Sequence, residues 1–246
     1  MEGNAPKSHI TGAPGWEHYD EQELLFKLAT ALADDKEALI VEIGGEFGMS
    51  ASIFSKAAPK ATIYSIDVVF GSETGRIHEA NLKEAGVGKN VIRIAADSHD
   101  KSTLEQVNKL AKGDEIDLLF IDGDHSYGGA LLDLNLWTPL VKVGGKVAIH
   151  DNACITNTMP HPLHYQVSQA VAKWISESAG VWAQVEMVYS TLVFQRIGAK
   201  LPTMKEAVDS GEIKPTAPKG KAHTPIETDV IDGDLVPKTK ATGRKK

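Results

Sequence analysis

The stretch from residue 116 to residue 152 constrains the fold more than any other part of the chain. It opens with the apolar run Ile116–Ile121, which is typical of a strand buried on both faces of a parallel sheet. After a polar loop, Ser126 can cap a helix whose apolar residues recur at helical spacing up to Trp137. A second apolar run, Lys146–Ile149, closes the unit. The order strand, helix, strand predicts two neighbouring parallel strands.

Both of these predicted strands end in polar residues. The carboxyl ends of parallel strands lie at one edge of a sheet, and open α/β sheets bind their ligands at that edge. We therefore expect six polar side chains to converge there: Asp122, Asp124, His125, His150, Asp151 and Asn152.

The same alternation runs through the rest of the chain. Apolar runs predict earlier strands at 38–43, 62–67 and 91–95, and the segments between them carry helical patterns at 50–56, 74–85 and 104–110. The short loops favour a doubly wound, Rossmann-like α/β fold with a mostly parallel sheet. After residue 152 the pattern predicts a helix near 166–176. Two strands follow at 182–189 and 191–196, and their very short connection predicts a C-terminal antiparallel hairpin.

Three regions follow from these patterns. We interpret residues 1–37 as a lead-in and a helix, residues 38–200 as the folded domain, and residues 201–246 as a tail. The tail has no aromatic residue and holds five of the eleven prolines. Such a segment can bury little apolar area, so we predict that the tail is disordered.

Composition argues against several classes of protein. No apolar run approaches the roughly 18 residues that span a membrane, and the N-terminal residues lack the apolar core of a signal peptide. The single cysteine, Cys154, excludes an internal disulfide. A cytoplasmic location without a membrane partner is therefore the default expectation. The net charge of −7 does not suggest a nucleic-acid partner, and a homo-oligomer is left open.

The turn after the first predicted strand is rich in glycine. Gly44 and Gly48 allow the backbone to approach a ligand closely, and the helix that follows offers free N–H groups. A dinucleotide-binding fingerprint would need a third glycine at the position of Glu46, which disfavours an NAD-dependent oxidoreductase. Asp67 ends the second strand and can accept hydrogen bonds from ribose hydroxyls. The turn and this acid together predict a nucleotide-containing cofactor.

At this point the sequence resembles a known group of enzymes. The spacing Glu-x-Gly-x-x-x-Gly from Glu42 to Gly48 resembles motif I of class I S-adenosylmethionine (SAM)-dependent methyltransferases. The segments FIDGDHSY and GGKVAIHDN resemble the type-24 methyltransferase family and the metal-dependent O-methyltransferases, such as catechol and caffeoyl-coenzyme A O-methyltransferase. The resemblance covers about residues 38–197. It implies that SAM is bound by Glu42, Gly44, Gly48, Asp67, Asp97, Ser98 and Asp122.

The resemblance also implies a metal site and a catalytic base. In the metal-dependent enzymes, an acid after the fourth strand and an Asp-Asn pair after the fifth hold a divalent ion, and the matching residues are Asp122, Asp151 and Asn152. His125 stands where those enzymes have the lysine proposed as the general base. Mg²⁺ or Mn²⁺ bound by oxygen ligands lowers the pKa of a hydroxyl, and an imidazole suits a base because its pKa is ~6.5. We therefore predict O-methylation of a small hydroxylated molecule, with Asp122 and His125 as catalytic residues.

The residues leave other interpretations open. Asp122 could contact only cofactor and backbone, the pair Asp151-Asn152 could cap a turn, and His125 could be structural. The alternative functions are a metal-independent sugar or N-methyltransferase and a SAM-binding module without catalysis.

Overall fold

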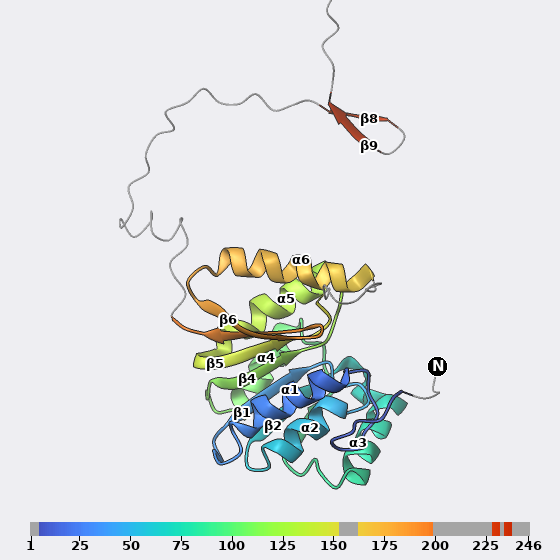
Figure 1. Cartoon of the computed structure of the whole chain (residues 1–246), viewed down its shortest axis with the longest axis vertical. Coiled ribbons are helices and arrows are strands. Elements are labelled where there is room, and N and C mark those ends of the chain that lie inside the picture. The colour runs from blue at the N-terminus through green and yellow to red at the C-terminus, as the bar shows by residue number, and fades with distance from the viewer. Residues whose placement is uncertain (1–4, 153–161, 199–227, 232–233, 238–246) are drawn as a thin grey trace, which may run out of the picture. The chain divides into compact units, whose positions relative to one another are not determined.

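A computed structural model of the chain describes residues 5–152, 162–198, 228–231 and 234–237. The chain divides into two units, Met1–Leu201 and Pro202–Lys246, and each is described by itself. The described residues of the first unit form a seven-stranded sheet and six α-helices (Figure 1).

The strands of the sheet lie in the order β3-β2-β1-β4-β5-β7-β6. Strands β1 to β5 are parallel, and β7 runs antiparallel between β5 and β6. The predicted α/β fold with a C-terminal antiparallel hairpin is therefore confirmed. The strand bounds are β1 Leu39–Ile43, β2 Thr62–Ile66, β3 Val91–Ile94, β4 Ile116–Ile121, β5 Val141–Ile149, β6 Trp182–Val188 and β7 Thr191–Arg196.

Helices cover both faces of the sheet (Figure 1). Helices α1 and α2 pack on one face, and α4, α5 and α6 contribute to the apolar core on the other. Their bounds are α1 Tyr19–Thr30, α2 Met49–Ala57, α3 Glu73–Glu84, α4 Lys101–Leu110, α5 Tyr127–Trp137 and α6 Pro162–Glu177, with the short 3₁₀ segments η1 Val68–Gly71 and η2 Thr138–Leu140.

Strand β4 shows why the apolar runs form the centre of the sheet. All six of its residues are buried. Leu119 and Ile121 belong to the core under α4 to α6, whereas Leu118 and Phe120 belong to the core under α1 and α2, as the alternation of a strand requires. Burying each such side chain stabilises the fold by about 1.5–3 kcal/mol. Ser126 caps α5 as predicted, because its hydroxyl accepts the N–H of Gly129 at 3.1 Å.

Most of the predicted tail, residues 201–246, lies outside the described residues. Within it, β8 Thr228–Ile231 pairs antiparallel with β9 Asp234–Pro237, a pairing that the composition did not indicate. A search of the described helices found none with the length and apolar character needed to cross a membrane.

Candidate active site

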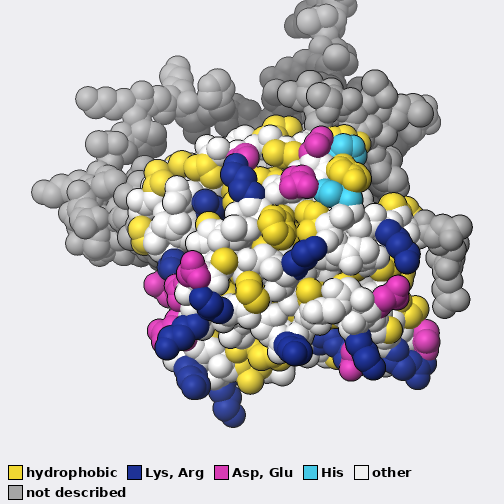
Figure 2. Space-filling view, turned by 60° about the horizontal axis from the view of Figure 1, so that its bottom comes forward, with side chains coloured by type: hydrophobic (Ala, Val, Ile, Leu, Met, Phe, Trp, Pro, Cys, Tyr) yellow, Lys and Arg dark blue, Asp and Glu magenta, His cyan; other side chains and the backbone are white. Residues whose placement is uncertain are grey.

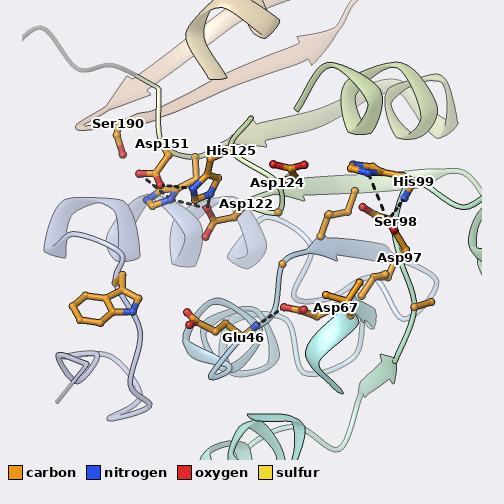
Figure 3. A pocket seen from close by; sticks show the side chains of 18 of the residues that line it. Glu46, Asp67, Asp97, Ser98, His99, Asp122, Asp124, His125, Asp151 and Ser190 are labelled. Atoms are coloured by element: carbon orange, nitrogen blue, oxygen red, sulfur yellow. Dashed lines mark hydrogen bonds and ion pairs between the residues drawn. The ribbon is translucent and has the colours of Figure 1, made fainter. Parts of the chain in front are cut away.

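A pocket of about 790 Å³ lies at the carboxyl ends of the parallel strands (Figure 3). Backbone hydrogen bonds hold the ends of β1, β4 and β5 side by side. The N–H of Asp122 donates to the carbonyl of Ile43 at 2.9 Å, and the N–H of His150 donates to the carbonyl of Ile121 at 3.0 Å. Residues that follow each of the strands β1 to β5 line the pocket, and Trp16, Glu21, Tyr189 and Ser190 complete its wall.

The glycine turn sits directly against the loop that follows β4. Gly44 has a φ of +86°, and a Cβ at this position would lie 2.1 Å from the carbonyl oxygen of Asp122. Only glycine allows both the left-handed backbone and this close approach. The turn therefore brings the end of β1 against the end of β4, as a cofactor that spans both strands would require.

Asp67 lies in the pocket wall and holds the glycine turn. One of its carboxylate oxygens accepts the backbone N–H groups of Gly45 at 3.0 Å and Glu46 at 2.9 Å. The other oxygen accepts the N–H of Val69 at 3.0 Å and caps η1. Asp67 thus holds the glycine turn in place, and the ribose contact that the sequence predicts for it remains a prediction.

Glu42 and Gly48 are not among the residues that line the pocket. Glu42 is fully buried, and this burial raises its pKa to about 8. Its carboxylate accepts the hydroxyl of Ser65 on β2. Gly48, with a φ of +90°, is the N-cap of α2. Both residues support the turn from behind the pocket wall, so their predicted contact with the cofactor remains a prediction.

Asp97 and Ser98, which the resemblance predicts to bind SAM, line the end of the pocket that lies away from Asp151 (Figure 3). Ser98 donates its hydroxyl to Asp133 at 2.6 Å and accepts the indole N–H of Trp137 on its carbonyl at 3.0 Å. His99 lines the pocket as well, and its Nε2 lies 3.3 Å from Asp133. Helix α5 therefore fixes this loop through Asp133 and Trp137, and the contact of Asp133 was not expected from the sequence.

Asp122, His125 and Asp151 form the acidic side of the pocket. The Nε2 atom of His125 lies 3.2 Å from Asp122, and its Nδ1 atom lies 3.4 Å from Asp151. The hydrogen bond to Asp122 raises the pKa of His125 above its ordinary value, and the charges of both carboxylates add to this effect. Among the described residues, these three offer ligand atoms that all lie within 4.8 Å of one another.

His150 lies between two carboxylates. Its Nδ1 atom is 3.0 Å from Asp122, and its Nε2 atom is 3.1 Å from Glu21. Burial lowers the pKa of His150, but the charges and hydrogen bonds of Asp122 and Glu21 outweigh burial and raise it well above its ordinary value. Burial also disfavours the charged form of Asp122, yet His150 and His125 hold the pKa of that carboxyl at about 2. The pocket therefore contains an ionised carboxylate beside a charged imidazole.

Asn152 behaves differently from its five predicted neighbours. Asp122, Asp124, His125, His150 and Asp151 all line the pocket, whereas Asn152 is buried and is not among the lining residues. Its amide donates to the carbonyl of Ile149 at 3.1 Å, and its buried side-chain oxygen has no hydrogen-bond partner among the described residues. The predicted metal ligands Asp122 and Asp151 thus face the pocket together with His125, and the predicted role of Asn152 as a third ligand remains a prediction.

Glu21, in the N-terminal segment, is a pocket residue that was not singled out from the sequence. Glu21 lines the pocket although it lies on α1, and Trp16 precedes that helix. The signal for Glu21 is present in the sequence. It shares its helical spacing with the buried residues Leu24, Leu25 and Leu28, so an acid lies on the face of α1 that packs against the sheet.

Comparisons with known proteins concern the family and the fold of the chain. Residues 41–152 match the family model of a methyltransferase domain. A curated relative, the uncharacterised protein R132 of Acanthamoeba polyphaga mimivirus, is 32% identical over 133 residues. That match covers 52% of this chain and 57% of the relative, so the chain spans just over half the length of the protein it resembles.

Solved structures share the fold at low identity. An O-methyltransferase from Bacillus cereus in complex with SAH has a TM-score of 0.53 at 15% identity, over 74% of this chain and 82% of that one. The O-methyltransferase TomG from Streptomyces achromogenes, in complex with SAM, has a TM-score of 0.52 at 19% identity over the same shares. An rRNA methylase from Streptococcus thermophilus reaches 0.50 at 13% identity, over 71% of this chain and 95% of that one, so the fold alone does not choose the acceptor. Residues 41–152 thus match the family model of a methyltransferase domain, and the sheet has the fold of these solved O-methyltransferases.

Proposed function

We propose that the protein is a SAM-dependent methyltransferase that methylates a hydroxyl group of a small molecule. One observation carries this proposal: a single pocket joins the glycine turn, Asp67 and Asp97 to the cluster of Asp122, His125 and Asp151 (Figure 3). The first group suits a nucleoside, and the second suits a hydroxyl that must lose its proton. Methyl transfer to oxygen needs both in one place.

The cofactor side provides binding and orientation. SAM supplies an electrophilic methyl group on a sulfonium. In the proposal, the close contact of Gly44 with the loop of Asp122 leaves room for the cofactor beside the sheet edge, Asp67 accepts the ribose hydroxyls, and Asp97 and Ser98 hold the adenine. Holding the methyl group in line with the acceptor can by itself supply much of the rate acceleration.

The acceptor side provides a base. His125 reaches both Asp122 and Asp151, so its ring has a fixed orientation toward the pocket. We assign it as the group that takes the proton from the acceptor hydroxyl, in its neutral form. The neutral form gains population as the pH rises through the pKa of this imidazole, so the rate should rise with pH over that range.

A divalent ion fits the same side of the pocket. Asp122 and Asp151 offer carboxylate oxygens that lie close together, and Asn152 has a buried side-chain oxygen without a hydrogen-bond partner among the described residues. Oxygen ligands of this kind suit Mg²⁺ or Mn²⁺, which would lower the pKa of the acceptor hydroxyl. In this proposal the two carboxylates and Asn152 hold the ion, and His125 is kept for the proton.

The rim of the pocket supports a small acceptor. Trp16 is 64% exposed and Tyr189 is 39% exposed, and both line the pocket. Their aromatic faces can pack against the apolar part of an acceptor. Figure 2 shows one face of the molecule, where Lys and Arg side chains gather along the lower part and Asp and Glu side chains lie among them.

The test is turnover of SAM to S-adenosylhomocysteine in the presence of a panel of hydroxylated small molecules. We expect product only with an acceptor, with loss of activity in EDTA and recovery with Mg²⁺ or Mn²⁺. Activity that persists in EDTA would support the metal-independent alternative. Binding of SAM without turnover on hydroxyl, sugar or amine acceptors would support a binding module and contradict the proposed activity.

A further inference from the structure

The carboxylate of Glu21 is almost fully enclosed, with 1% of the residue exposed. It accepts five hydrogen bonds. One oxygen accepts the N–H of Ser190 at 2.9 Å, its hydroxyl at 2.6 Å and the hydroxyl of Thr191 at 2.8 Å. The other accepts the N–H of His18 at 2.9 Å and lies 3.1 Å from Nε2 of His150. A carboxylate bonded in this way has a fixed position and a fixed charge.

His150 passes this constraint on to the pocket. With Glu21 on its Nε2 side and Asp122 on its Nδ1 side, both ring nitrogens donate to carboxylates, and the ring cannot rotate without breaking a charged hydrogen bond. His150 itself is only 7% exposed. The chain of contacts therefore leads from α1 through the imidazole to the Asp122 carboxylate in the pocket.

A role in stability alone would explain this arrangement poorly. Helix α1 is already attached to the sheet by the buried side chains of Leu24, Leu25 and Leu28. A buried ion pair contributes little net stability compared with apolar packing of the same volume, because both charges must be desolvated. The ion pair instead fixes the orientation of the side chains, since each carboxylate oxygen and each ring nitrogen has a defined partner.

We propose that Glu21 is a positioning residue of the methyl-transfer site, acting through His150 to orient the carboxylate of Asp122. This inference rests on the proposed function, because it assigns Asp122 to the reacting side of the pocket. Residues of this kind behind a metal ligand commonly change metal affinity by 10–100-fold when they are substituted. The N-terminal helix is thus part of the active site, although it lies outside the region that matches the methyltransferase family.

The first test compares Glu21→Gln with Glu23→Gln. Glu23 lies on the same helix, is exposed and contacts His9, so it controls for the loss of one negative charge on α1. In the unmodified protein, one carboxylate oxygen of Glu21 accepts hydrogen bonds from His18 and His150. In Glu21→Gln, the amide N–H can stand in that place, and it cannot accept these hydrogen bonds. We expect calorimetry with Mn²⁺ to show about tenfold or greater loss of affinity for Glu21→Gln and no change for Glu23→Gln. Unchanged or tighter Mn²⁺ binding by Glu21→Gln overturns the inference.

The second test asks whether Glu21 acts through His150. In His150→Gln, the new side-chain amide can still donate a hydrogen bond to Glu21. It no longer contacts Asp122, which Nδ1 of His150 contacts in the unmodified protein. Adding Glu21→Gln to His150→Gln should therefore cause no further loss of Mn²⁺ affinity, whereas independent losses would add and overturn the inference.

Crystal structures separate this inference from the proposed function. If the unmodified protein binds no Mn²⁺, the metal part of the proposed function fails, and the inference then depends on the position of Asp122 alone. A displaced Asp122 carboxylate in Glu21→Gln, but not in Glu23→Gln, supports it. An Asp122 side chain that keeps its place in Glu21→Gln overturns it, whatever the metal does. Should Glu21→Gln fail to fold, the structure of His150→Gln provides the same readout.

Discussion

Gly44 and Asp122 touch through their backbones, since a Cβ on Gly44 would lie 2.1 Å from the Asp122 carbonyl oxygen. This contact joins the cofactor turn after β1 to the acidic loop after β4. The distance between the two halves of the pocket is therefore fixed by backbone atoms, and it does not depend on the rotamer of any side chain.

Substituting Gly44 by alanine tests this contact. Gly86 provides a matched control, because its φ of +71° is also left-handed but nothing lies within 4 Å of its Cβ position. We expect Gly86→Ala to cost about 1–2 kcal/mol from backbone strain. Gly44→Ala should cost about 1–3 kcal/mol more, because the Asp122 loop must move. Urea unfolding measures both, and equal losses would show that the contact is unimportant.

Glu17 predicts a specific dependence of stability on pH. It is buried, and burial, together with the charge of Asp122, raises its pKa from 4.5 to about 7. A raised pKa means that the folded state keeps a proton that the unfolded state releases. The contribution of Glu17 to the free energy of unfolding is therefore complete below pH 4.5 and is lost as the pH rises toward 7. At 1.36 kcal/mol per pKa unit, the loss is about 3 kcal/mol.

Glu17→Gln removes this titration. We expect the variant to lose less stability than the unmodified protein between pH 4.5 and pH 7, with Glu23→Gln behaving like the unmodified protein. Denaturant unfolding at several pH values provides the measurement. The same slope for Glu17→Gln and the unmodified protein would mean that Glu17 is ionised in the folded state.

His125 predicts the pH dependence of turnover. The base acts in its neutral form, so the rate should rise as the pH rises through the pKa of this imidazole. His125→Ala should lower turnover by about 10²–10⁴-fold, and least at high pH, where the acceptor hydroxyl ionises unaided. His9→Ala, which does not line the pocket, is the control. An unchanged rate in His125→Ala would remove the base from the mechanism.

The parts of the fold that could be predicted are those fixed by local pattern. Ile116–Ile121 was predicted with its observed bounds because a strand buried on both faces needs a continuous apolar run. Asp122, His125 and Asp151 could be placed together because parallel strands bring their carboxyl ends to one edge. Strand β5 begins at Val141, earlier than predicted, because the left-handed Gly144 is accommodated in it by a shift of register against β4.

The parts that could not be predicted depend on the backbone path and on distant contacts. Asp151 has a φ of +56°, so the chain turns there, and Asn152 enters the fold beside Ile149. A sequence motif does not reveal such a turn. Glu21 and His150 are 129 residues apart, and their contact exists only because α1 packs against the sheet edge.

Binding of the cofactor tests the central claim most directly. Calorimetric titration of the purified protein with SAM should show binding, and Asp67→Ala should weaken it by about 2 kcal/mol or more, because the ribose hydroxyls lose their acceptor and the Gly45–Glu46 turn loses its anchor. Asp34→Ala, an exposed acid paired with Lys60, should leave SAM binding unchanged. Binding of NAD without binding of SAM would contradict the account, because the pocket would then serve a different cofactor.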